Sequence, residues 1–328
     1  MMNHRTIAQA LRAGGPEVIE VNREDLAPLQ KGEVLVRVKA AGLNHVDSLV
    51  RSGSYSFQFP FPYGVGVEGA GVIEDVGANV SLQAGYRVCW TGVFGSCANY
   101  VIANADMLTA LPDELSFEVG ASLAHAGLTA GGLARHWPLQ KGSYAVVWGA
   151  AGAVGRLLVA FLAEHGVHVI GIASGHRVDV VLASGAVHAI DRTSRDVKQA
   201  VLAFTNQQKV AAVFDPVGAE TFQTNLELIA PRGCLINYGQ LSGSLPTIDL
   251  KQLMMTGSIF VTKYGPGGVS GATEMRTMIG AALSLASSRP VLIGSSRRFP
   301  LTRTADAYRA MDSGVTDKVL VLPDEPVH

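Results

Sequence analysis

The chain has 328 residues, of which 48% are hydrophobic and 16% charged, and its formal net charge at pH 7 is −1. This composition suits two domains with a large core, and it excludes a disordered chain and a basic surface for nucleic acid or anionic lipid. The cysteines, Cys89, Cys97 and Cys234, form neither a disulfide framework nor a CxxC metal clip, which is typical of a reducing compartment. Because the N-terminus lacks the apolar core of a signal peptide, we expect a cytoplasmic protein that does not enter a membrane.

Residues 1–127 have the pattern of a β-rich domain, with short apolar runs separated by Gly, Pro, Asn and Asp. A short helix is expected at 44–51, and a second helix begins at Ser116, whose hydroxyl can cap it. The predicted strands cover residues 6–11, 18–21, 33–41, 69–76, 85–90 and 98–103.

Residues 128–264 alternate between strand and helix, which predicts an α/β domain with a doubly wound sheet of six parallel strands. After residue 264, two helices (272–288 and 304–312) and a strand (318–322) are too few for a separate domain, so we expect residues 265–328 to return to the first one. In the middle domain the predicted strands are 144–148, 168–173, 187–190, 210–214, 233–237 and 257–261, and the predicted helices are 154–165, 176–184, 194–205 and 219–229.

The loop after the first strand of the middle domain has the pattern of a dinucleotide-binding turn, Ala150-x-Gly152-x-x-Gly155. Gly152 lets the backbone approach a pyrophosphate, Gly155 lets the helix pack closely on the strand, and the helix N-terminus offers N–H groups to phosphates. The alternative is a tight turn that binds nothing. A membrane span over 144–163 is disfavoured because three glycines and Arg156 interrupt it.

The end of the second strand of this domain indicates which coenzyme is bound. An NAD site usually has an acidic residue there for the ribose 2′-hydroxyl, but residues 173–177 contain none. Ser174, His176 and Arg177 suit a 2′-phosphate instead, and Arg192 can add a second cation. We therefore predict NADPH, with ordinary surface charges as the alternative interpretation of the two arginines.

Seven segments spread over nearly the whole chain carry a family resemblance. They are GGPEV (14–18), AAGLNHVDSLVRSGSY (40–55), GVGVEGAGVIEDVGANV (64–80), AGLTA (126–130), GAAGAVG (149–155), FDPVG (214–218) and NYGQ (237–240). In these segments the chain resembles the zinc-free quinone oxidoreductase (zeta-crystallin-like) branch of the medium-chain dehydrogenase/reductase superfamily.

The resemblance implies a GroES-like catalytic domain, made of residues 1–127 and 265–328, around an inserted Rossmann domain at 128–264. It implies NADPH in the cleft between the two, and hydride transfer to a quinone or another conjugated carbonyl. It also implies a homodimer or homotetramer.

Metal-dependent relatives place a Cys where this chain has Asn44 and a His where it has Val67. Of their zinc ligands at most His125 remains, and His45 is one residue out of place. Since catalytic zinc needs about three protein ligands, we expect no metal.

Three family positions are candidates for catalysis: Asn44, Tyr55 and Thr129. Asn44 can hydrogen-bond the nicotinamide ribose or polarise a substrate carbonyl, Tyr55 can donate to a quinone or stack on it, and Thr129 matches a threonine near the nicotinamide. Turn capping and core packing are the alternatives for Asn44 and Tyr55. The candidates for cofactor binding are Asn44, Thr129, Ala151, Gly152, Ala153, Val154, Ser174, His176, Arg177, Arg192, Val217, Tyr238, Gly239 and Lys263.

Two departures from the family affect the functional hypothesis. Leu49 replaces a second pocket tyrosine, which motivates an alternative: an NADPH-dependent reductase of alkenal or enone double bonds. Arg192 stands where a tyrosine often meets the adenosine phosphate, and it can strengthen NADPH binding. No fixed general acid is evident, which leaves a third hypothesis, an NADPH-binding structural or regulatory protein with little turnover. Cys97 is expected to be a buried structural residue.

Overall fold

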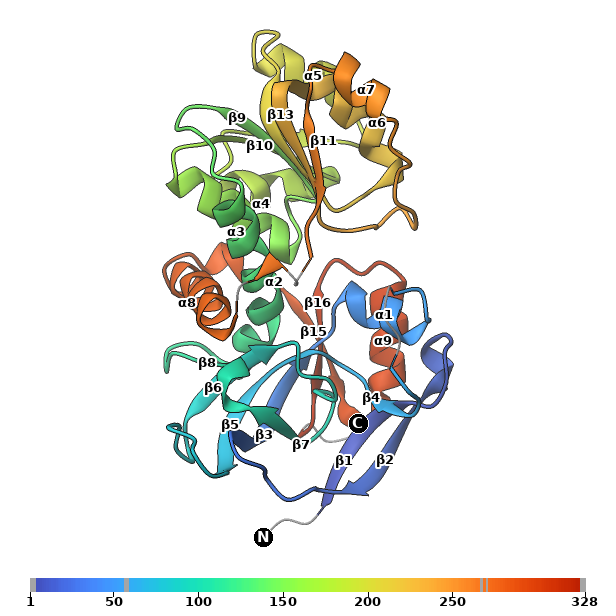
Figure 1. The fold of residues 1–328 in the computed structure, drawn as a ribbon, viewed down its shortest axis with the longest axis vertical. Coiled ribbons are helices and arrows are strands. Elements are labelled where there is room, and N and C mark those ends of the chain that lie inside the picture. Colours follow the sequence, from blue (N-terminus) through green and yellow to red (C-terminus); the bar gives the residue numbers. More distant parts are fainter. Residues whose placement is uncertain (1–3, 56–58, 266–267, 270, 325–328) are drawn as a thin grey trace. The chain divides into compact units, whose positions relative to one another are not determined.

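The computed structural model describes residues 4–55, 59–265, 268–269 and 271–324 (Figure 1). The chain divides into two compact units. Unit 1 comprises Met1–Leu128 and Gly271–His328, so it contains both ends of the chain, and unit 2 comprises Thr129–Ser270.

The described part of unit 2 contains a parallel sheet of six strands in the order β11-β10-β9-β12-β13-β14, which confirms the predicted doubly wound sheet. The strand order reverses between β9 and β12, and ligands of such sheets bind at the strand ends beside that point. The strands are β9 (Tyr144–Trp148), β10 (His168–Ala173), β11 (His188–Asp191), β12 (Val210–Asp215), β13 (Ile229–Asn237) and β14 (Phe260–Lys263), and the helices are α3 (Ala153–Glu164), α4 (Val178–Ala183), α5 (Val197–Phe204), α6 (Ala219–Leu228) and α7 (Leu250–Met255).

Three elements of unit 2 differ from the prediction. The last strand begins at Phe260 and not at residue 257, because Gly257 and Ser258 have φ of 107° and 56° and the chain is still turning there. The helix predicted from residue 176 starts as a 3₁₀ turn, Gly175–Arg177, before α4. Helix α7 was not predicted at all.

The described part of unit 1 is built on a seven-stranded sheet in the order β15-β16-β3-β5-β6-β8, with β7 also paired to β3, and a smaller sheet β2-β1-β4. In Figure 1 the red strand β16 lies beside the blue strand β3, so strands from both ends of the chain share one sheet. The strands are β1 (His4–Ala10), β2 (Ile19–Asp25), β3 (Glu33–Gly42), β4 (Tyr63–Gly64), β5 (Glu68–Val76), β6 (Arg87–Thr91), β7 (Tyr100–Asn104), β8 (Leu108–Ala110), β15 (Ser296–Pro300) and β16 (Lys318–Leu322).

Four α-helices complete the described part of unit 1: α1 (His45–Arg51), α2 (Phe117–His136), whose last residues belong to unit 2, α8 (Ala272–Ser288) and α9 (Thr304–Asp312). Ser116 Oγ accepts a hydrogen bond from the Val119 N–H at 3.3 Å, as expected of a cap for α2. The strands β4, β8 and β15 were missed, since two are only two or three residues long and the third carries adjacent arginines, Arg297 and Arg298. Among the described helices, none is long and apolar enough to cross a membrane.

Candidate active site

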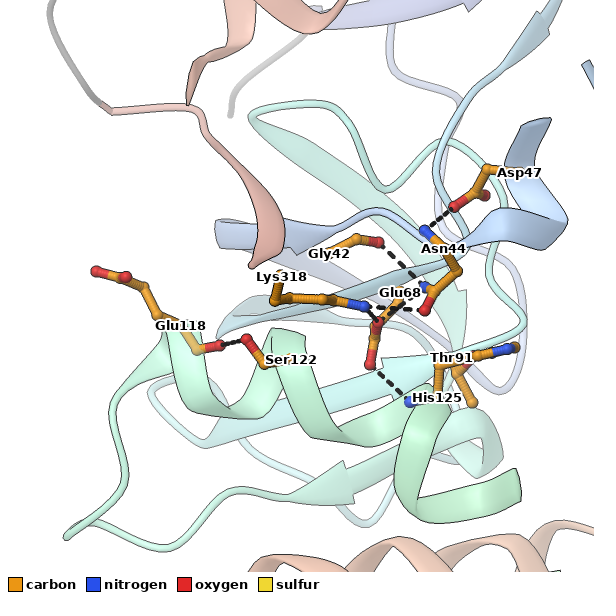
Figure 2. A network of polar contacts seen from close by, with 9 residues as sticks. All are labelled: Gly42, Asn44, Asp47, Glu68, Thr91, Glu118, Ser122, His125 and Lys318. Atoms are coloured by element: carbon orange, nitrogen blue, oxygen red, sulfur yellow. Dashed lines mark hydrogen bonds and ion pairs between the residues drawn. The ribbon is translucent and has the colours of Figure 1, made fainter. Parts of the chain in front are cut away.

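A buried carboxylate, Glu68, organises the polar centre of unit 1 (Figure 2). Its side chain is 0% exposed, and both of its oxygens are satisfied. Oε2 accepts from Asn44 Nδ2 at 2.8 Å and from Lys318 Nζ at 2.7 Å, while Oε1 accepts from the backbone N–H of His125 at 2.6 Å. The ion pair with Lys318 supplies the opposite charge that a buried carboxylate requires.

The strand register brings these side chains together. Gly42, the last residue of β3, pairs with Glu68 on β5 and with Leu320 on β16. The residue two positions after Gly42 is Asn44, and the residue two positions before Leu320 is Lys318, so the antiparallel pairing sets the two side by side. A Cβ at Gly42 would lie 2.8 Å from Glu68 Oε2 and 2.9 Å from Lys318 Cε, so only glycine leaves room for the cluster.

The Asn44 side chain is fully engaged in this cluster. Its Nδ2 donates to Glu68 and, at 3.3 Å, to the Gly42 carbonyl, and its Oδ1 accepts from Lys318 Nζ at 2.9 Å. Asn44 is also the N-cap residue of α1, and its backbone N–H donates to Asp47 Oδ2 at 2.8 Å. The backbone of Asn44 therefore begins the helix, while its side chain belongs to the Glu68 cluster.

Asp47 is a second buried carboxyl group, 4% exposed. Burial raises its pKa to about 7, against the lowering influence of the Asn44 N–H and of the Lys318 and Arg51 charges. The nearby Glu68 charge raises that pKa further. Asp47 thus titrates close to neutral pH in the folded protein.

Two histidines adjoin the cluster. Burial lowers the pKa of His125, and its Nδ1 lies 2.9 Å from Thr91 Oγ1. Burial likewise lowers the pKa of His45. Among the described residues, no group of three or more His, Cys, Asp or Glu side chains is arranged to hold a metal ion.

In unit 2 the glycine-rich loop fits a phosphate ligand. Helix α3 begins at Ala153 with Gly152 as its N-cap, so no side chain covers its first N–H groups. Gly152 is exposed, and the backbone can be approached closely there. A Cβ at Gly155 would lie 2.3 Å from the Gly149 carbonyl oxygen, so glycine is required for α3 to pack against the loop. Ala151, Ala153 and Val154 are partly exposed on the same turn.

The ends of β10 and β11 bring Ser174 and Arg192 together, with Arg192 Nε donating to Ser174 Oγ at 2.9 Å. Asp191 lies next to them, but its Oδ1 accepts from the N–H groups of Gly175 and Thr193 and from the Thr193 hydroxyl, at 2.7 to 3.0 Å. These bonds, that of the Thr193 hydroxyl first, hold the pKa of Asp191 well below its usual range. Oδ1 of this carboxylate is thus bonded to the two neighbouring turns.

Arg177 and His176 lie in the 3₁₀ turn after β10, and His176 is exposed. Within the described ranges, neither side chain makes a hydrogen bond or an ion pair, so both can reach a ligand.

Several predicted cofactor residues lie around a third buried carboxyl group, Asp215. Its Oδ1 accepts from the Val217 N–H at 2.7 Å. The Tyr238 hydroxyl donates to the Trp148 carbonyl at 3.3 Å, and burial raises the pKa of that phenol. Lys263 Nζ donates to the Gly239 carbonyl at 2.9 Å and to an asparagine side chain on β13. Tyr238 and Lys263 therefore tie strand ends together, a role that the sequence did not indicate.

Two further candidates, Tyr55 and Thr129, lie next to α1 and on α2. Tyr55 follows α1 and is half-buried, and its backbone N–H donates to the Leu49 carbonyl at 3.0 Å. Thr129 is a half-buried residue of α2. Cys97 is fully buried, and burial raises the pKa of its thiol well above the usual value, so it is not an available nucleophile.

Sequence reasoning missed the partners of Asn44. The sequence patterns gave Glu68 no role, and Lys318 was only the first residue of a predicted strand. The one available signal was a charged residue opening the apolar run KVLVL, which indicates a strand end as readily as a site.

The two-unit fold, the Glu68 cluster of unit 1 and the glycine-rich turn of unit 2 together define an oxidoreductase of the medium-chain dehydrogenase/reductase type. Residues 30–113 match the alcohol dehydrogenase GroES-like domain family, and residues 153–281 match the zinc-binding dehydrogenase family. A quinone oxidoreductase of Pseudomonas aeruginosa is 33% identical over 94% of this chain and 97% of its own length. This chain therefore belongs to the zinc-free quinone oxidoreductase branch of the superfamily.

Two solved structures extend the comparison. Escherichia coli quinone oxidoreductase complexed with NADPH superposes with a TM-score of 0.88 at 28% identity, over 97% of this chain and 100% of that one. A 2-haloacrylate reductase superposes with a TM-score of 0.84 at 27% identity, over 98% of this chain and 100% of that one.

The substitution Asp47→Asn is expected to stabilise the protein more at pH 8 than at pH 5. The pKa of the Asp47 carboxyl group is about 7 in the folded state, against an ordinary value of 3.8 in the unfolded chain. Between these two pH values the folded protein therefore binds one proton more than the unfolded chain. The contribution of this group to stability therefore falls as pH rises through that window, by roughly 4 kcal/mol in full. Urea unfolding of both proteins between about pH 5 and 8 measures the difference, and a difference that does not change with pH would contradict the assignment.

Proposed function

We propose that this protein is an NADPH-dependent reductase that transfers hydride to a quinone. The observation that carries the proposal is the Gly149–Gly155 turn with an uncapped helix N-terminus, beside a strand end, residues 173–177, that has cations and no acidic residue. The quinone oxidoreductase relatives, one of them complexed with NADPH, support the same function.

NADPH supplies the hydride, and the residues of unit 2 bind and orient it. The N–H groups of Ala153 and Val154 face the pyrophosphate at the start of α3. Ser174, Arg177 and Arg192 hold the adenosine 2′-phosphate, since a guanidinium meets phosphate oxygens in pairs. Gly175 and Thr193 of the neighbouring turns already bond to Oδ1 of Asp191.

A double-bond reductase is the second candidate. The similarity to a 2-haloacrylate reductase favours it, and so does Leu49, which replaces a family tyrosine and leaves the pocket more apolar. In both reactions the hydride acceptor is a conjugated carbonyl compound, so the two candidates share one coenzyme site and differ in the shape of the acceptor.

Coenzyme oxidation by the purified, metal-analysed protein tests these candidates. An ortho-quinone, a para-quinone and a simple enone are each compared with NADPH and with NADH. We expect NADPH-selective turnover of a quinone. Turnover of the enone alone would assign double-bond reduction, and NADPH binding without turnover of any acceptor would favour a structural or regulatory role. Near-stoichiometric zinc in the active protein would argue against the zinc-free assignment.

The coenzyme preference is tested separately. Arg192→Ala and Arg177→Ala are each expected to weaken NADPH binding about 10- to 100-fold, the loss of a charge-assisted bond, and to leave NADH binding nearly unchanged. Arg195→Ala, an exposed arginine three residues beyond Arg192, is the matched control. Dissociation constants from fluorescence titration measure the effect, and equal losses for both coenzymes would remove the 2′-phosphate assignment.

We further propose that the protein is a cytoplasmic homodimer that pairs through β14. This edge strand presents Phe260, 64% exposed, close in sequence to Leu250 and Met255, at 78% and 73%. An apolar sheet edge favours pairing with a second copy. Phe260→Lys should lower the mass found by light scattering to that of one chain, whereas Tyr86→Lys, at an exposed tyrosine of unit 1, should not. A monomeric unmodified protein would overturn the proposal.

The free thiols fit the cytoplasm, which cell fractionation can test.

A further inference from the structure

One carboxylate, Asp191, lies between the two turns that carry the arginines of the proposed phosphate site. Asp191 is the last residue of β11, and it pairs with Ala173 at the end of the neighbouring strand β10. The turn after β10, Gly175–Arg177, contains Arg177, and Arg192 directly follows Asp191 in the turn after β11. Both turns belong to unit 2, so the contacts between them lie within one compact unit.

The Asp191 side chain accepts hydrogen bonds from both turns. From the turn after β10, the N–H of Gly175 donates to Oδ1 at 2.8 Å. From the turn after β11, the N–H and the hydroxyl of Thr193 donate to the same oxygen at 3.0 and 2.7 Å, and Ser194 Oγ donates to Oδ2 at 3.0 Å. One side chain therefore connects the two turns.

The bond to Gly175 is the part of this network that crosses from one turn to the other. Gly175 has a φ of 56°, in the left-handed region that glycine adopts at little cost. Two residues further on, the N–H of Arg177 donates to the Ser174 carbonyl at 3.4 Å, which is long for a hydrogen bond. Because that bond within the turn is weak, the bond from Gly175 to Asp191 is the stronger restraint on where the turn holds Arg177.

The negative charge of Asp191 acts in the opposite direction, since it repels a phosphate. Asp191 is half-buried and Arg192 beside it is exposed, so water and salt screen this repulsion. The hydrogen bonds of a carboxylate are short-range and stronger than those between neutral groups. We therefore expect the bonds of Asp191 to outweigh its charge.

We propose that Asp191 is a positioning residue for the 2′-phosphate of NADPH, because it ties the turn of Arg177 to the turn of Arg192 and so holds both arginines toward one ligand. This inference rests on the proposed function for the identity of the ligand, but not for the link between the turns. An acidic residue in a coenzyme site normally favours NADH, whereas this one supports NADPH.

Two substitutions separate the bonds of Asp191 from its charge. Asp191→Asn removes the charge but keeps an oxygen that can accept from Gly175 and Thr193, whereas Asp191→Ala removes both. We expect Asp191→Ala to weaken NADPH binding about tenfold, the loss of one such bond, and to leave NADH binding nearly unchanged. Asp191→Asn should bind NADPH at least as tightly as the wild type. Dissociation constants from fluorescence titration measure both coenzymes.

Asp196→Ala is the matched control. Asp196 is an exposed aspartate five residues further on, and it accepts from the Gln199 N–H at 2.8 Å as the cap of α5. Its removal should keep the wild-type ratio of NADPH to NADH affinity. If Asp191→Ala binds NADPH as tightly as the wild type or more tightly, Asp191 acts only as a charge and the proposal is overturned. Equal losses for both coenzymes would also overturn it, since they would indicate a general disturbance of unit 2.

The link between the turns is tested without coenzyme. Hydrogen–deuterium exchange of overlapping peptides across residues 174–178 reports on the Gly175 N–H. We expect exchange there to be about tenfold faster in Asp191→Ala, close to that of the wild type in Asp191→Asn, and unchanged in Asp196→Ala. Unchanged exchange in the folded Asp191→Ala protein would contradict the link. A wild type that does not prefer NADPH to NADH would instead reject the proposed coenzyme, and the exchange experiment would still decide whether Asp191 holds the turn.

Discussion

The buried ion pair of Glu68 and Lys318 is the interaction on which unit 1 depends. A carboxylate with no exposure to water is tolerated only when charge and hydrogen bonds compensate it, and here a lysine, an asparagine and a backbone N–H do so. Because the lysine comes from β16 and the carboxylate from β5, the pair also joins the two ends of the chain around β3. The polar cluster around Asn44 and the closure of the domain therefore depend on the same ion pair.

Unit 2 uses a buried carboxyl group in a comparable way. Asp215 ends β12 and accepts from the N–H of Val217, the hydroxyl of Thr221 and the amide of Asn225. These bonds hold the loop after β12 at the point where the strand order of the sheet reverses. In both units a carboxyl group inside the protein orients neighbouring polar groups, and among the described residues Glu68 is paired with a cation whereas Asp215 forms no ion pair.

The alternation of strand and helix was enough to predict the sheet of unit 2, because each strand is a continuous apolar run and each turn is marked by local residues. The cofactor loop was predicted for the same reason, since its three glycines act on backbone a few residues away. Local signals did not predict very short elements such as β4. They also placed the start of the last strand too early, because the chain still turns at Ser258. They also gave no hint that Lys263 and Tyr238 bond to neighbouring strand ends.

The sequence by itself determined the doubly wound sheet, the glycine-rich turn after β9, the absence of an acid at residues 173–177, and the family. Each of these follows from short segments of sequence, and the family from several such segments spread along the chain. Only the tertiary structure decided what surrounds Asn44, because Glu68 and Lys318 lie 24 and 274 positions away and meet it through strand pairing. The polarity of the Asn44 amide follows from those two charges, and no pattern within one segment records it.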